Sequence, residues 1–98
     1  MSKPVVLRRV AREEFDEAAD WYEARQPGLG PRFVAAIQVE FDRISVNPQS
    51  HAVVRRDIRK AVVTGFPYSV YYREQQTRVV VIAVFHSSRD PSIWQGRS

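Results

Sequence analysis

The sequence contains no cysteine and only two histidines, His51 and His86, among its 98 residues. Without cysteine the chain can form neither a disulfide scaffold nor a thiolate metal site. Two well-separated histidines give no recognisable cluster of metal ligands either. The sequence also lacks a P-loop, a dinucleotide-binding glycine fingerprint and a Gly-x-Ser-x-Gly motif. We therefore expect neither a metal nor an organic cofactor.

Long hydrophobic runs are missing as well. No apolar run approaches the roughly 18 residues of a membrane span, and the N-terminus lacks the core of a signal peptide. These absences predict a cytoplasmic protein with no membrane partner. The hydrophobic content of 44% and the aromatic content of 11% are ordinary for a folded domain. The length suits one core but not two, so we expect a single domain over residues 1–98.

Hydrophobic spacing predicts the element order β-α-α-β-β-β. Strands are expected at residues 4–9, 58–63, 68–73 and 77–86, and a first helix at residues 11–25. Gly30-Pro31 is expected to open a second helix, which Asn47-Pro48 ends. Each helix carries one apolar stripe: Phe15, Ala18, Ala19 and Tyr22 on the first, and Val34, Ile37, Phe41 and Ile44 on the second. A short linker predicts an antiparallel helical hairpin that covers one sheet. The sequence thus predicts an α+β fold with a short C-terminal tail, in which Asp90-Pro91 could begin one helical turn.

The last predicted strand is the most apolar part of the chain. The unbroken run from Val79 to Phe85 is typical of a strand that is buried on both faces. His86 and Arg89 follow where this strand meets solvent, a usual place for a functional site. His86 could act as a general acid or base near neutral pH, or it could simply finish the strand with a hydrogen bond. Arg89 could hold a phosphate or a carboxylate, or it could pair with a nearby acidic residue.

The positive charge is concentrated in the second half of the chain. Residues 1–50 have a net charge of −1 and residues 51–98 a net charge of +5. Four basic residues lie within six positions: Arg55, Arg56, Arg59 and Lys60. Such a cluster favours a polyanion or an acidic partner, but charge on an edge strand also protects a sheet from aggregation. In contrast, Glu13, Glu14 and Asp16 are expected in the first turns of the first helix, on a solvated face.

Aromatic residues accompany this positive charge. They are Tyr68, Tyr71, Tyr72 and Trp94. Aromatic side chains interleaved with arginine suit single-stranded RNA, whose bases can stack on them. In a domain of this size, however, we expect at least two of the four to be core residues. His51 lies in a polar loop and is expected to be solvated.

Two segments resemble the C-terminal half of the RelE/ParE superfamily of bacterial toxins. They are Phe66-Pro-Tyr-Ser-Val-Tyr-Tyr72 and the stretch from Val80 to Trp94, which ends in the pattern His-x-x-Arg-x-Pro-x-x-Trp. The resemblance covers nearly the whole chain, including the N-terminal strand and the Pro-Gly-Leu-Gly-Pro linker between the helices. It implies a helical hairpin packed on a mainly antiparallel, curved sheet.

The resemblance also implies a partner. Such toxins form type II toxin–antitoxin systems, and we expect an acidic ParD- or RelB-like antitoxin in a heterotetramer or larger assembly. Antitoxins of this kind wrap around the toxin and mask its site, and a free edge strand could accept antitoxin backbone. The candidate antitoxin contacts are Trp21, Tyr22, Arg59 and Arg89. Trp21 lies just off the apolar stripe of its helix, so we expect it to be exposed.

The superfamily has two branches with different targets. RelE-like members are metal-independent endoribonucleases that cut mRNA in the ribosome, and His86 and Arg89 are the catalytic candidates in that case. ParE-like members are not nucleases and inhibit DNA gyrase. Ser69 occupies the position where a nuclease would usually carry arginine, and Trp94 cannot transfer a proton. We therefore favour a ParE-like gyrase inhibitor, which is not an enzyme, over the nuclease. A third alternative is a degenerate member that binds only its antitoxin.

Under either toxic hypothesis the chain must contact gyrase, the ribosome or a nucleic acid. The candidate contacts are Arg55, Arg56, Arg59, Lys60, Tyr71, Arg73 and Trp94.

Overall fold

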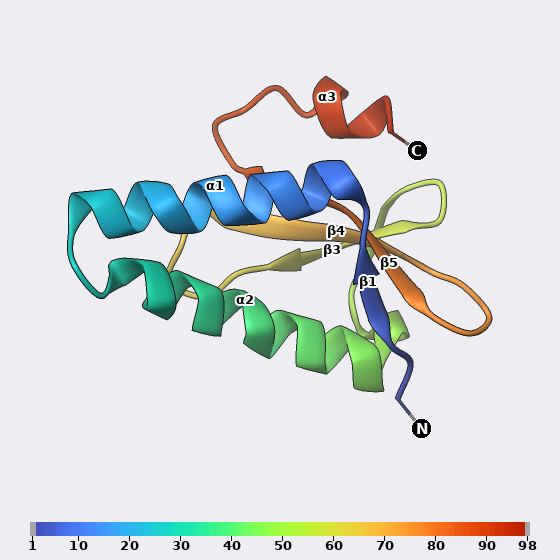
Figure 1. Ribbon diagram of the computed structural model, residues 1–98. Helices are drawn as coiled ribbons and strands as arrows, with labels where there is room; N and C mark the ends of the chain where they lie inside the picture. Colours follow the sequence, from blue (N-terminus) through green and yellow to red (C-terminus); the bar gives the residue numbers. More distant parts are fainter. Residues whose placement is uncertain (1, 98) are drawn as a thin grey trace.

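The computed structural model describes residues 2–97 and has an α+β architecture, with a helical hairpin packed on one face of a sheet (Figure 1). The elements are β1 (Val5–Leu7), α1 (Arg9–Arg25), α2 (Leu29–Val46), a 3-10 turn η1 (Pro48–Ser50), β2 (Val53–Arg55), β3 (Ile58–Val62), β4 (Tyr68–Glu74), β5 (Val79–His86) and α3 (Ser92–Gln95). In the part of the chain described, no helix is both long and apolar enough to cross a membrane.

The five strands follow the order β1-β5-β4-β3-β2. Only β1 pairs in parallel, with β5, and the other neighbours are antiparallel. The predicted order is confirmed, and so is a helical turn after Asp90-Pro91, which is α3. The short edge strand β2 was not predicted. The first helix begins at Arg9, two residues earlier than predicted. Glu13, Glu14 and Asp16 therefore lie beyond its first turn, and the prediction that they sit at the helix start is wrong.

The helix-side core is built from the two predicted stripes, with one residue exchanged at the start of α2. Phe15 of α1 packs edge-to-face against Phe33 and Phe41 of α2, at centroid distances of 6.1 and 5.8 Å. Phe33 is fully buried, whereas Val34 is 40% exposed. The prediction of Val34 as a core residue is therefore wrong, because the larger neighbouring ring occupies the inward position.

The connection between α1 and α2 is closed by Glu23 and Gly30. The Glu23 carboxylate accepts hydrogen bonds from the backbone N–H groups of Gly28 and Gly30 at 2.9 and 3.0 Å, and so caps the start of α2. A Cβ on Gly30 would lie 2.9 Å from the carbonyl oxygen of Ala19, so only glycine allows the helices to approach this closely. These contacts fix the angle of the hairpin over the sheet.

The opposite face of the sheet is partly covered by the C-terminal tail. Trp94 of α3 stacks on Tyr71 of β4 with the ring centroids 4.1 Å apart, and both residues are buried. All of Val79–Phe85 is buried, which confirms that β5 is covered on both faces. Figure 1 shows α3 set apart from the helical hairpin.

Tyr72 connects the sheet to the end of α2. Its ring is fully buried, and its hydroxyl donates a 2.7 Å hydrogen bond to the carbonyl oxygen of Pro48. Burial raises the pKa of Tyr72 from 10.0 to about 12. Ionisation of this phenol therefore opposes folding.

Replacing Tyr72 with phenylalanine should make the protein less sensitive to alkaline unfolding. Well below pH 10 the Tyr72 phenol is neutral in both the folded and the unfolded protein. Because its pKa is raised in the folded protein, the unfolded protein loses the phenol proton first as the pH rises from 10 towards 12. Between pH 8 and 11, Tyr72→Phe should lose about 1.4 kcal/mol less stability than the wild type, by urea unfolding. At pH 8 the variant should itself be about 1–3 kcal/mol less stable, because the Pro48 carbonyl loses its donor. Equal losses in the two proteins would contradict the assignment.

Candidate functional site

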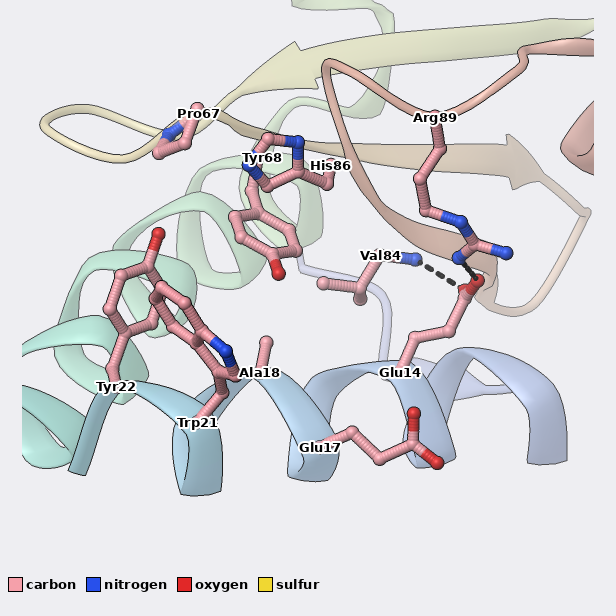
Figure 2. A pocket seen from close by; sticks show the side chains of 10 residues that line it. All are labelled: Glu14, Glu17, Ala18, Trp21, Tyr22, Pro67, Tyr68, Val84, His86 and Arg89. Carbon is pink, nitrogen blue, oxygen red and sulfur yellow. Dashed lines mark hydrogen bonds and ion pairs between the residues drawn. The ribbon is translucent and has the colours of Figure 1, made fainter. Parts of the chain in front are cut away.

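A groove of about 650 Å³ lies between α1, the start of β4 and the end of β5 (Figure 2). It is lined by Glu14, Glu17, Ala18, Trp21 and Tyr22 from α1 and by Pro67, Tyr68, Val84, His86 and Arg89 from the sheet side. The β3–β4 turn delivers Pro67 and Tyr68 to its rim, and Gly65 in that turn has a φ of 85°, a conformation that favours glycine. The groove thus combines an aromatic wall with charged residues.

The aromatic wall begins with Trp21. This side chain is 53% exposed, which confirms the predicted exposure. Its ring packs edge-to-face against Tyr22 at 5.1 Å, and the Arg25 guanidinium lies 4.3 Å from its centroid. Burial raises the pKa values of Tyr22 and Tyr68, so both phenols are neutral at physiological pH. The wall is therefore a largely apolar surface that is preorganised by ring contacts.

Glu14 organises the other end of the groove. One carboxylate oxygen accepts the backbone N–H of Val84 at 3.1 Å and Arg97 Nη1 at 2.9 Å. The other accepts Arg89 Nη1 at 2.8 Å and Arg97 Nη2 at 3.0 Å. Figure 2 shows the Glu14 carboxylate pointing up from α1 at the Arg89 side chain and the Val84 backbone. The side chain is only 10% exposed, so the prediction of a solvated acidic face is wrong for this residue.

His86 is held by the turn that follows β5. Its Nδ1 accepts hydrogen bonds from the backbone N–H of Ser88 at 3.0 Å and from the Ser88 hydroxyl, 2.8 Å away. A backbone N–H can only donate, so the Nδ1 lone pair is occupied and the proton of the neutral ring is on Nε2. The ring also packs edge-to-face on Tyr68 at 5.0 Å. This geometry matches the alternative of a histidine that finishes a strand with a hydrogen bond.

The structure brings together most, but not all, of the predicted antitoxin contacts. Trp21, Tyr22 and Arg89 line the groove together with His86. Arg59 does not line it, and instead donates 2.6 and 3.3 Å hydrogen bonds to the carbonyl oxygens of His51 and Gln49. Arg59 thus fastens the segment after α2, away from the other three residues.

Some of the predicted target contacts are exposed, whereas others are buried or already paired within the chain. Arg55, Arg56 and Lys60 are exposed on the β2–β3 hairpin. Arg73 is paired with Asp57 at 2.8 Å and its side chain is 19% exposed. The burial of Tyr71 and Trp94 against each other leaves neither ring a free face on which a base could stack.

Two interactions were not predicted from the sequence. The pairing of Glu14 with Arg97 joins residues 83 positions apart, and no local pattern indicates it. His51 was predicted to be solvated, but its side chain is 22% exposed and its Nδ1 lies 3.2 Å from the Tyr72 hydroxyl. Its Nε2 lies 3.9 Å from a carboxylate oxygen of Glu40, which is itself 1% exposed. Both clusters depend on contacts between distant segments.

Within residues 2–97, no group of three acidic, histidine or cysteine side chains is arranged to hold a metal ion. The groove contains one histidine and one arginine, and both already have partners inside the chain. Its accessible chemistry is therefore that of an apolar surface with charged ends.

Comparison with known proteins identifies relatives of this fold. A family model described as the ParE toxin of the type II toxin–antitoxin system parDE matches residues 5–91. A solved structure titled as the chromosomal ParDE toxin–antitoxin system from P. aeruginosa matches with a TM-score of 0.62 and 13% sequence identity, over 87% of this chain and 96% of that one. At this identity the structural match supports the fold alone. No curated protein sequence matches the chain.

Replacing Glu14 with glutamine should loosen the C-terminal tail. The amide is isosteric but removes the charge that Arg89 and Arg97 share, and we expect the free energy of unfolding to fall by about 1–3 kcal/mol. Hydrogen exchange should become faster across residues 87–97. Glu13→Gln is the matched control, because the Glu13 side chain is 54% exposed and, over residues 2–97, forms an ion pair with the exposed Arg9 alone. This substitution should change stability by less than about 0.5 kcal/mol. Equal effects of the two substitutions would contradict the role of Glu14.

Proposed function

The chain belongs to the ParE toxin family of type II toxin–antitoxin systems, and from this premise we propose that it stops growth by binding DNA gyrase and is neutralised by an acidic, ParD-type antitoxin. The antitoxin occupies the groove beside α1. The basic hairpin β2–β3 and the C-terminal tail contact the complex of gyrase with its DNA. The observation that supports this proposal best is the groove itself, which has an exposed aromatic wall and whose histidine and arginine are both engaged within the chain.

The groove suits an amphipathic protein segment. Trp21 offers a large apolar face, and aromatic side chains of this kind are frequent anchors at interfaces. Positive charge lies at both ends, with Arg25 beside Trp21 and Arg89 beside Glu14. A partner that carries apolar anchors flanked by carboxylates would satisfy all of these groups. Its negative charge would also be attracted to the net positive charge of the chain.

The same groups are poorly suited to cut RNA. Cleavage by a ribose 2′-OH requires a base, an acid and a cation beside the phosphate. The only lone pair of neutral His86 is on Nδ1 and is occupied by Ser88, so the ring cannot serve as a base without breaking that contact. Arg89 is held by Glu14 at 2.8 Å, and Arg97 shares the same carboxylate, so the Arg89 guanidinium is committed to an ion pair although the cluster keeps a net positive charge. Ser69, at the position where a nuclease would usually carry arginine, is buried. These three features support gyrase inhibition over nuclease activity.

Expression of the chain without its antitoxin should arrest growth, and His86→Gln should leave that arrest intact. The substitution removes any proton transfer by the ring but keeps a polar side chain at the rim of the groove. Cellular mRNA 5′ ends should show no new cuts at codon-related positions, while markers of DNA damage should rise.

Three results would contradict this prediction. New mRNA ends that disappear in His86→Gln would identify a ribosome-dependent nuclease. Arrest that is lost in the variant although the variant is folded would give His86 a direct role. Normal growth with folded, soluble wild-type chain would indicate a member that retains only antitoxin binding.

Truncation of Trp21 should weaken antitoxin binding without unfolding the toxin. Because the ring is about half exposed, Trp21→Ala should keep the unfolding temperature within a few degrees of the wild type. Loss of an aromatic anchor at an interface typically costs at least about 2 kcal/mol, so the dissociation constant should rise about thirtyfold or more by calorimetry.

Val39→Ala provides the control for that measurement. Val39 is also an exposed apolar residue, at 46%, but it lies on α2 and does not line the groove. Its substitution should leave the affinity for the antitoxin unchanged. Equal losses for the two variants, or no loss for Trp21→Ala, would place the antitoxin elsewhere.

A further inference from the structure

The β2–β3 hairpin lies at the end of the sheet that is farthest from the groove. The register places Ile58 beside Arg73 at one end of β4, whereas Tyr68 pairs with His86 at the other end, in the groove. The seven residues of β4 separate the two ends by about 20 Å. The hairpin projects from the sheet end opposite the α1–α2 connection (Figure 1). A partner that fills the groove therefore leaves the hairpin accessible.

Positive charge at this end of the sheet is only partly compensated. In the strands and their adjoining loops at this end, the basic residues are Lys3, Arg55, Arg56, Arg59, Lys60, Arg73 and Arg78, and the acidic ones are Asp57 and Glu74. Both acidic residues are already paired, with Arg73 at 2.8 Å and with Lys3 at 2.7 Å. Over residues 2–97, Arg55 and Arg56 make no ion pair, and Lys60 only lies 6.0 Å from the centroid of the Tyr71 ring. These three side chains form an uncompensated basic surface, which we call the hairpin surface.

The tip of the hairpin carries an unusual backbone conformation. Arg55 pairs with Ile58, so Arg56 and Asp57 form the turn, and Arg56 has a φ of 54°. Glycine and asparagine are favoured in such turns, because a longer side chain in the left-handed region is strained. Arg73 donates from Nε to both carboxylate oxygens of Asp57, at 2.9 and 2.8 Å, and so holds the turn in place. An exposed arginine is thus kept at the tip at a cost in stability, which is typical of a functional position.

From these observations we propose that the hairpin surface, formed by Arg55, Arg56 and Lys60, binds the phosphate backbone of double-stranded DNA. The choice of DNA rests on the proposed action on gyrase, an enzyme that holds a DNA duplex. The preference for a duplex over a single strand rests on the aromatic residues. Tyr71, Tyr72 and Trp94 are all buried, so no ring at this end is free to stack on an unpaired base. Contacts from arginine and lysine alone give binding that is independent of sequence and sensitive to salt.

The test uses the purified chain without antitoxin and a labelled 20-base-pair duplex of mixed sequence, with anisotropy measured over a range of salt concentrations. The wild type should bind the duplex, and its affinity should fall with salt. Arg56→Gly should reduce the slope of log K against log salt by about 0.9, the value for one lost phosphate contact. Its unfolding temperature should be equal or higher, because glycine relieves the strained turn. A loss of binding together with retained stability cannot be attributed to misfolding.

Arg32→Gln is the matched control. Arg32 is an exposed arginine on α2, outside both the hairpin and the groove, and its substitution should leave the slope unchanged. The proposal is overturned if Arg56→Gly binds DNA as the wild type does, or if a single strand of the same length binds as tightly as the duplex. It is also overturned if polyglutamate displaces the duplex at equal charge concentration, which would indicate an acidic protein as the partner. The assay contains no gyrase, so failure of gyrase inhibition in cells would leave its outcome unaffected.

Discussion

The carboxylate of Glu14 is the interaction on which the functional half of the structure depends. It joins three segments that are far apart in the sequence: α1, the backbone of β5 at Val84, and the C-terminal tail through Arg89 and Arg97. The tail in turn places Trp94 on Tyr71 and covers the second face of the sheet. One side chain therefore closes the charged end of the groove, pairs with Arg89 and holds the tail that covers the second face of the sheet. The engagement of Arg89, which lines the groove with His86, follows from the same pairing.

The division of the molecule into two ends follows from the topology. The antiparallel strands place the aromatic groove at one end of the sheet and the basic hairpin at the other. An antitoxin in the groove and a polyanion at the hairpin would thus not compete for the same side chains. In this account the protein acts through two binding surfaces, and neither requires the chain to perform a chemical step.

The elements of the fold could be predicted from the sequence because they depend on local spacing, but details that depend on packing could not. On α2 the prediction holds for Ile37, Phe41 and Ile44 but fails at Val34, since a helical stripe does not reveal whether Phe33 or Val34 faces inward at its first turn. Trp21, His86 and Arg89 line the groove. The sequence could single them out because each lies next to an apolar stripe or just beyond a buried strand. Glu14 and His51 were misjudged, because their partners lie 70 or more and 21 residues away. The burial of Tyr71 and Trp94 likewise depends on where the tail folds back.

The most direct test of the proposed function is a cleavage assay with purified DNA gyrase, supercoiled plasmid and the purified chain. The account predicts that linear DNA accumulates after the enzyme is denatured, and that an excess of the antitoxin added first prevents this accumulation. The opposite result is equally clear. If gyrase remains fully active in the presence of the chain while mRNA is cut on translating ribosomes, the groove is catalytic and the account is wrong.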